Sequence, residues 1–206
     1  MYNVSSSPHV KSKVTTQSIM RDVIIALMPA TIFGIYNYSH LFGAKYGLRS
    51  ALLIILTVVA CVLSEYVFEK ITKRESTLDD LSAVVTGLLL ALNMPVSASW
   101  WMPIVGSAFA IIIAKQLFGG IGQNFVNPAL IARAFLLASY PTAMTTWTVN
   151  GETTATPLAL LKTIKDGAAL TDLDLPSLAQ VITGQGIGGC IGETCAIALV
   201  IGFIYL

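Results

Sequence analysis

Charged side chains are scarce in this chain, because only 11% of its 206 residues are Asp, Glu, Lys or Arg. Soluble domains carry about 25% charged residues. With 55% hydrophobic residues and a mean hydropathy of +0.75, the composition is that of a membrane protein. The formal net charge of +1 gives no electrostatic basis for binding nucleic acid, so we expect no nucleic-acid partner.

Cysteine and histidine are also few. Cys61, Cys190 and Cys195 have neither the number nor the spacing of a disulfide framework or a zinc site. We interpret them as small apolar packing residues and predict no metal site. His9 and His40 stand apart from any Ser-His-Asp or metal-ligand pattern, so hydrolytic catalysis has no support.

Long apolar segments are abundant, and they predict an all-α polytopic membrane protein. A membrane span needs about 20 apolar residues, with roughly 17–25 as the range. The six segments are 23–42, 51–68, 81–95, 102–118, 127–140 and 187–206. The third and fifth are short and carry prolines at their ends. Such segments are either broken helices that line a site inside the membrane or tilted, partly buried short helices.

Residues 1–22 are polar and lack the apolar core of a signal peptide, which predicts a cytoplasmic tail. Cytoplasmic loops carry an excess of Lys and Arg. With the N-terminus inside, the inner segments hold Lys11, Lys13, Arg21, Lys70, Lys73, Arg74 and Lys115, and the outer segments hold Lys45, Arg49, Lys162 and Lys165. The inner segments thus hold seven basic residues and the outer segments four, which favours a cytoplasmic N-terminus. In this orientation a five-helix bundle (23–140) leads into an extracytoplasmic loop (141–186). The sixth segment (187–206) then returns inward, and its apolar end leads us to expect further helices beyond it.

Arg133, Glu193 and Glu65 are charged residues inside predicted spans, and they are candidates for chemistry. Arg133 interrupts the fifth segment, and a buried Arg costs about 2.5–3.5 kcal/mol on insertion scales. It must therefore face protein, water or an anion. Glu193 and Glu65 are the acidic counterparts. Such groups are candidates for a functional site, ion passage included, or else they pair across helices or extend toward the headgroups.

A glycine-rich turn at 118–129 leads into the segment that contains Arg133. Its backbone N–H groups can receive a phosphate or the polar edge of a ring. We therefore predict Gly120, Asn124, Asn127 and Arg133 as cofactor-binding residues. The glycine spacing is not that of a dinucleotide fingerprint. A second glycine cluster at 184–192 is at least as consistent with close packing of membrane helices.

The longest polar segment contains Thr-Thr-Ala-Thr-Pro at 153–157, followed by a helix-like run that Gly167 closes. Proline at the first helical position and glycine just past the end are helix start and stop signals. Thr156 is therefore a candidate N-cap, where free N–H groups and the helix dipole would stabilise an anion. On spacing alone, an ordinary cap of a surface helix is the commoner explanation.

The sequences at 5–9 (Ser-Ser-Ser-Pro-His), 119–134 and 153–161 together resemble the D subunit of the Rnf electron-transport complex. The same family includes the B subunit of the sodium-pumping NADH:quinone reductase, and the resemblance covers the whole chain in order. It implies a fold related to urea transporters, with two repeats of about five helices, the second opening at 187–206. It also implies electron transfer linked to sodium or proton movement, beside other subunits, in the inner (plasma) membrane of a bacterium or archaeon.

In that family FMN is attached through its phosphate to the last threonine of a Ser/Thr-Gly-Ala-Thr motif. The resemblance assigns this role to Thr156, with Ala155 in place and Thr153 at the Ser/Thr position. The family glycine is Thr154 here, and Asn150 replaces an acidic residue often found six positions before the threonine. The resemblance thus implies covalent FMN, a flavin transferase as a partner, and a second, non-covalent flavin such as riboflavin as a further candidate. A phosphodiester also suits a helix N-terminus.

Two other functional classes remain open. The broken segments and Arg133 also suit a small-solute channel or transporter of urea-transporter-like fold without a redox role, although such a channel has no use for the threonine motif. The other class is a structural scaffold that holds redox partners together.

Overall fold

The computed structural model describes residues 14–74, 76–149, 152–153, 162, 177–184, 189–193 and 195–206. Its elements are α1 (Thr16–Phe42), α2 (Ala44–Thr72), η1 (Leu78–Asp80), α3 (Ser82–Leu92), α4 (Trp101–Ala108), η2 (Phe109–Ile113), η3 (Gln116–Phe118), α5 (Pro128–Ser139), α6 (Pro141–Thr145), β1 (Thr148–Val149), β2 (Glu152–Thr153), α8 (Leu178–Thr183) and α9 (Ala196–Tyr205). Within these residues, the short antiparallel β1–β2 pair is the only β-structure. The all-α class predicted from composition is confirmed.

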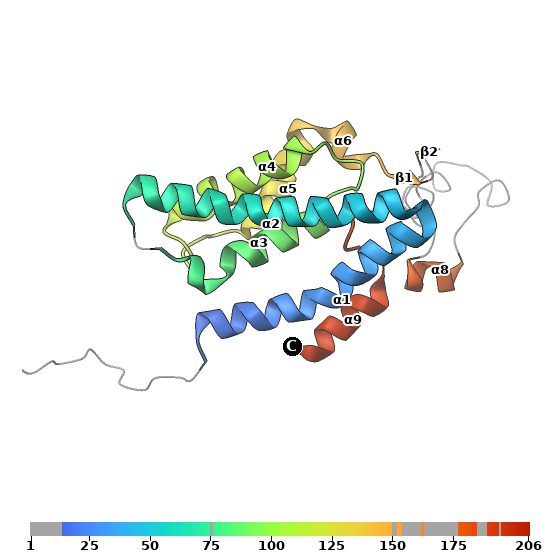
Figure 1. The fold of residues 1–206 in the computed structure, drawn as a ribbon, viewed down its shortest axis with the longest axis horizontal. Helices are drawn as coiled ribbons and strands as arrows, with labels where there is room; N and C mark the ends of the chain where they lie inside the picture. The colour runs from blue at the N-terminus through green and yellow to red at the C-terminus, as the bar shows by residue number, and fades with distance from the viewer. Residues whose placement is uncertain are drawn as a thin grey trace, which may run out of the picture.

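Two long helices, α1 and α2, form the frame of the molecule (Figure 1). Thr15 and Ser18 form a capping box that satisfies N–H groups at the start of α1. Pro29 lies inside α1, and the ribbon changes direction about midway along this helix, since proline removes a backbone hydrogen bond and kinks a helix. Gly43, with φ of 92°, reverses the chain between α1 and α2 in a single residue.

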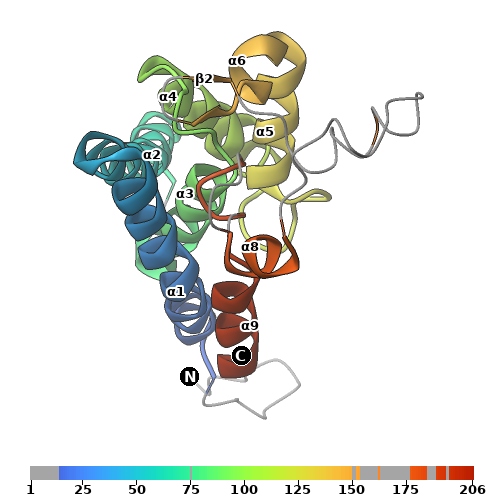
Figure 2. The ribbon, with the colours of Figure 1, turned by 90° about the vertical axis from the view of Figure 1, so that its right-hand side faces the viewer.

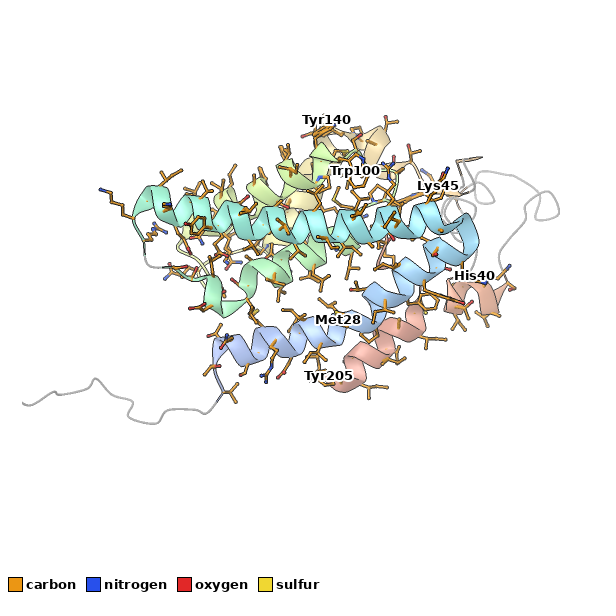
Figure 3. All side chains as sticks on the ribbon, in the orientation of Figure 1. Met28, His40, Lys45, Trp100, Tyr140 and Tyr205 are labelled. Carbon is orange, nitrogen blue, oxygen red and sulfur yellow. The ribbon has the colours of Figure 1, made fainter. Side chains whose placement is uncertain are left out.

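Three stretches are long and apolar enough to cross a membrane: Thr16–His40, Ala44–Thr72 and Trp101–Phe118. They expose large apolar side chains, among them Met28 of α1, and Tyr205 of α9 is exposed as well (both labelled in Figure 3). Exposed apolar surface on this scale fits contact with lipid. The chain is a membrane protein.

The third and fifth apolar segments form the short helices α3 and α5, as their length predicted. They have 11 and 12 residues, which is about 17–18 Å at 1.5 Å per residue, less than the ~30 Å hydrocarbon core. Nine residues of α3 are buried, because the helix packs between α1, α2 and α5 (Figure 2). These segments are short helices held inside the bundle.

The fourth segment is long enough to span, but its backbone changes type along its length. α4 continues into η2, a π-helical turn in which Ala114 N–H donates to the Phe109 carbonyl at 3.1 Å, and then into the 3₁₀ turn η3. A π-helical turn holds one more residue than an α-helical turn and is frequent at functional sites. It ends two residues before Lys115.

The prediction that 187–206 is one full-length span is wrong. The helix α9 has only ten residues, and residues 189–193 form a non-helical segment packed against the end of α3. Ile191 N–H donates to the Met94 carbonyl at 3.1 Å and Gly192 N–H to the Leu92 carbonyl at 2.8 Å. A Cβ on Gly192 would lie 2.7 Å from the Leu92 Cβ, so the approach requires glycine. The glycine cluster thus breaks the helix, since glycine disfavours helical backbone and permits this contact.

Candidate functional site

A buried ion pair lies near the Thr72 end of α2. Glu65 of α2 has no solvent exposure, and the Nζ of Lys115 lies 2.5 Å from its Oε1. The side-chain amide of Gln116 donates to the same oxygen at 2.7 Å, and Lys115 also contacts the Ser82 hydroxyl. Buried ion pairs form only with close geometry and extra hydrogen bonds of this kind. Of the two structural alternatives expected for Glu65, pairing within the protein or extension toward the headgroups, the structure shows pairing.

A second buried carboxylate, Glu69, lies one turn further along α2 and is 3% exposed. Its Oε1 accepts hydrogen bonds from the Thr77 backbone N–H at 3.1 Å and from the Thr77 hydroxyl at 2.5 Å. The same hydroxyl lies 3.3 Å from the Oε1 of Glu65. Glu65, Glu69, Lys115 and Thr77, which we call the carboxylate cluster, therefore form one connected group.

The glycine-rich turn lies beside this cluster. Gly119, Gly120 and Gly122 have φ values of 111°, 97° and 80°, which L side chains rarely adopt. Asn124 and Asn127 line an open cavity of about 220 Å³ whose wall also includes Lys115 and Ser82. The space in front of Gly120 is open, because a Cβ there would meet no atom within 4 Å. The turn thus presents backbone and two amides to a cavity.

Both asparagines also have structural roles. The Asn127 side chain accepts a hydrogen bond from Ala129 N–H at 3.0 Å and caps α5, which begins with Pro128. Asn124 donates to the Val126 carbonyl at 3.1 Å. These bonds shape the turn without a ligand, and the predicted cofactor contacts of the two residues stay a prediction.

Arg133 of α5 lies where α3 ends and the segment 189–193 passes. Its Nη1 donates to Asn93 Oδ1 at 2.7 Å and contacts Cys190 Sγ at 3.2 Å. Glu193 lies in the following turn and accepts from Cys190 N–H at 3.4 Å, so it is not in the middle of a spanning helix. Arg133 does face protein, and among the described residues it forms no ion pair with a carboxylate. We call Arg133, Asn93 and Cys190 the arginine crossing.

All three cysteines are buried and free, as their interpretation as packing residues predicted.

The threonine motif is described only at its first residue. Thr153 belongs to β2 and pairs with Thr148 of β1. Thr156 and Ala155 lie outside the described residues, as do Thr154 and Asn150. Figure 1 shows β1 and β2 near the Gly43 end of α2. The Ser97 hydroxyl bonds the Thr146 carbonyl at 2.8 Å, which anchors the residues just before β1 to the loop after α3.

The predicted cofactor residues that the structure describes do not all lie together. Arg74, just beyond the end of α2, donates to the Gln116 carbonyl at 3.2 Å, which holds η3 and the glycine-rich turn near the Thr72 end of α2. Thr153 lies near the opposite end, and α2 has 29 residues, about 43 Å at 1.5 Å per residue. Thr153 and the glycine-rich turn therefore lie near opposite ends of α2.

Two of the basic residues counted for the orientation make contacts within the protein. Lys115, counted in the inner segments, is only 2% exposed. Arg49, counted in the outer segments, donates to the Val96 and Ala98 carbonyls at 2.8 and 2.9 Å, so it holds the loop after α3. Without Lys115, six basic residues remain in the inner segments against four in the outer segments. The orientation stays a prediction. A lysine directly after the uncharged run 81–114 is the signal that could identify the buried pair.

Sequence comparisons identify the relatives of this chain. Residues 3–206 match the NQR2, RnfD, RnfE family. The D subunit of the Na(+)-translocating ferredoxin:NAD(+) oxidoreductase complex of Acetobacterium woodii is 50% identical over 98% of this chain and 61% of its own length. The D subunit of the proton-translocating ferredoxin:NAD(+) oxidoreductase complex of Clostridium ljungdahlii is 39% identical over 100% of this chain and 62% of its own length.

The D subunit of the ion-translocating oxidoreductase complex of Shewanella piezotolerans is 40% identical over 79% of this chain and 45% of its own length. The chain spans about three fifths of the length of the first two relatives. The match over nearly every residue, together with the long helices, confirms the resemblance drawn from the motifs: the chain belongs to the NQR2, RnfD, RnfE family.

Proposed function

We propose that this chain is part of a membrane flavoprotein subunit of an ion-translocating oxidoreductase complex, in which electrons pass through covalently bound FMN and drive the movement of sodium ions or protons. One observation carries the proposal: 50% identity over 98% of the chain to the D subunit of a complex named for this activity. One relative is named for sodium and another for protons, so both ions are candidates.

Thr156 is the proposed attachment residue for the FMN phosphate. The argument rests on Ala155 and Thr156 at the matching motif positions and on Pro157, which favours a helix start there. A helix N-terminus stabilises a phosphodiester through its free N–H groups and its dipole. The flavin would supply the redox chemistry, and the chain would hold it and tune its potential.

The proposed setting is the inner membrane of a bacterium or archaeon, with the N-terminus in the cytoplasm and residues 141–186 outside. The partners would be the other subunits of an Rnf-type complex, a flavin transferase and the lipid bilayer. Gly120, Asn124, Asn127 and Arg133 remain the candidate contacts for a second, non-covalent flavin such as riboflavin. Asn124 and Asn127 line one cavity, and Arg133 is not among the residues that line it. Arg133 instead contacts the neutral Asn93 and Cys190. We therefore expect the two asparagines and Arg133 to contact a ligand at two separate places.

In-gel fluorescence of the complete protein, co-expressed with its flavin transferase, tests the attachment. We expect a fluorescent band on a denaturing gel and an added mass equal to FMN less one water. Thr156→Ala should abolish both signals, whereas Thr163→Ala, a matched change outside the motif, should leave them intact. A wild-type protein without a flavin band, or a band that survives in Thr156→Ala, contradicts the assignment.

A further inference from the structure

The carboxylate cluster contains more negative than positive charge. Glu65 and Glu69 are both buried on one face of α2, four residues apart, and Lys115 is the buried cation beside them. Two other charged groups lie nearby. Arg74 is exposed and donates to the Gln116 carbonyl. Asp80 is a further acidic group, and it accepts from the backbone N–H and the hydroxyl of Ser82, the hydroxyl that Lys115 also contacts. One buried carboxylate therefore lacks a counter-charge.

Two oxygens of this pair also lack a partner. Glu65 Oε2 and Glu69 Oε2 are buried side-chain atoms without a hydrogen-bond partner. A buried carboxylate that is neither paired nor fully hydrogen-bonded is strongly unfavourable, and it normally takes up a proton or binds a cation. The two oxygens without a partner belong to Glu65 and Glu69, and both residues contact the Thr77 hydroxyl. The uncompensated negative charge and the unsatisfied oxygens therefore lie at the same place.

We propose that Glu65 and Glu69 form a binding site for one monovalent cation, either a proton or a sodium ion. A proton would sit on one orphaned oxygen and turn that carboxylate into a neutral acid. A sodium ion would be held by carboxylate oxygens and the Thr77 hydroxyl, the ligand type that hard cations take. In both cases the bound charge balances the second carboxylate, and Lys115 balances the first.

The site has two approaches from outside the bundle. Thr77 is exposed, so its hydroxyl connects the buried pair with solvent. On the other side, the open cavity of about 220 Å³ is lined by Lys115, which contacts Glu65, and by Ser82, which contacts Lys115. A cation can therefore exchange without unfolding of α2. The role of this exchange in ion translocation rests on the proposed function, whereas the binding itself rests on the contacts above.

Carbodiimide labelling of the complete protein in its native membranes tests the site. Dicyclohexylcarbodiimide adds to a protonated carboxylic acid buried in apolar surroundings and rearranges to a stable N-acylurea. The acid's oxygen bonds to the central carbon of the carbodiimide, and its proton moves to one nitrogen. The acyl group then shifts from that oxygen to the other nitrogen, so a carbon–oxygen bond breaks as the carbon–nitrogen bond forms, and the oxygen remains as the urea carbonyl. In sodium-free buffer we expect one label on the peptide that contains Glu65 and Glu69, decreasing as the pH rises. A wild-type protein without this label at any pH overturns the proposal.

Sodium chloride and choline chloride, compared at one pH and one ionic strength, identify the cation. Slower labelling in sodium identifies a sodium ion at the same oxygens, and labelling indifferent to sodium identifies a proton. Glu69→Gln should abolish the label. In this variant Lys115 balances the charge of Glu65, so Glu65 stays ionised and offers no protonated acid to the reagent. Asp79→Asn changes an exposed carboxylate next to the cluster and should leave the label unchanged. A label that persists in full on Glu65 in Glu69→Gln overturns the proposal.

The labelling and the flavin band separate the two proposals. A missing label in protein that keeps its flavin band removes the cation site alone. A missing flavin band in protein that keeps its label removes the covalent FMN alone.

Discussion

Lys115 and Arg133 both bring a positive charge into the apolar bundle, but their surroundings differ. Lys115 contacts Glu65 directly, with Glu69 one turn away, so carboxylates are in excess around it. The described partners of Arg133 are the neutral Asn93 and Cys190. The first environment suits a further cation, and the second leaves a positive charge available to a polar or anionic group. Two basic residues in one bundle can therefore have opposite binding preferences.

The largest effect is expected at the carboxylate cluster. Glu65→Gln leaves the buried Lys115 without its direct counter-charge, and breaking a buried pair on one side costs about 3–5 kcal/mol. Denaturant titration of the purified protein in detergent measures the loss. The double variant Glu65→Gln/Lys115→Met should recover part of it, because the unpaired charge is gone. A double variant less stable than the single one would show that the pair is not coupled.

A smaller effect is expected at the arginine crossing. Arg133→Gln removes hydrogen bonds from a charged donor, worth about 1.5–3 kcal/mol, but it leaves no unpaired charge behind. The same titration should therefore show a smaller loss than for Glu65→Gln. An equal or larger loss would mean that Arg133 has a carboxylate partner, and the contrast between the two sites would disappear.

Gly192→Ala probes the packing that brings the segment 189–193 to Arg133. Its Cβ would lie 2.7 Å from Leu92 Cβ, and overpacking of this kind costs about 1–3 kcal/mol. Gly189→Ala is the matched control, since a Cβ there meets nothing within 4 Å. We expect the first variant to unfold at lower denaturant than the second. Equal stabilities would indicate that the segment moves away from α3 without cost.

The smallest effect is expected at the glycine-rich turn. Asn127→Ala removes the cap of α5, which typically costs about 1 kcal/mol. Asn124→Ala removes a bond within the turn and should cost less. Thermal unfolding of both variants checks the order. If Asn127→Ala instead keeps its stability and loses a bound, non-covalent flavin, the residue serves a ligand in preference to the helix.

The parts of the fold that depend on local sequence were predictable. Segment length identified the two long helices and the short α3 and α5, and Asn127-Pro128 marked the start of α5. The break before α9 was not predicted, because hydropathy counts apolar residues and does not register that Gly192 permits a close backbone approach to Leu92. An apolar run of spanning length is therefore weak evidence for a single helix when glycines recur within it.

The carboxylate cluster was less predictable, because it depends on tertiary contacts. The position of Glu65 in an apolar run marks it as unusual, but Lys115 lies 50 residues away, and its burial depends on how η2 packs against α2. Glu69 and Thr77 give no signal in the sequence, since both lie close to charged residues that suggest a solvated loop. The threonine motif lies outside the described residues, so its assignment rests on the motif itself.

The π-helical turn η2 sets the rotational phase of everything that follows it in the fourth segment. An α-helix advances by about 100° per residue, so one extra residue in a turn rotates the next side chain by that angle. Lys115 comes two residues after η2, and its contact with Glu65 depends on this rotation. Deleting one residue from 109–113 would remove the wide turn and keep Lys115 in phase with α4. Winding the same residues into a regular α-helix would instead rotate the lysine by about 100°, away from its contact with Glu65. The backbone type of this apolar run therefore sets the electrostatics of the cluster, although no charged residue is gained or lost.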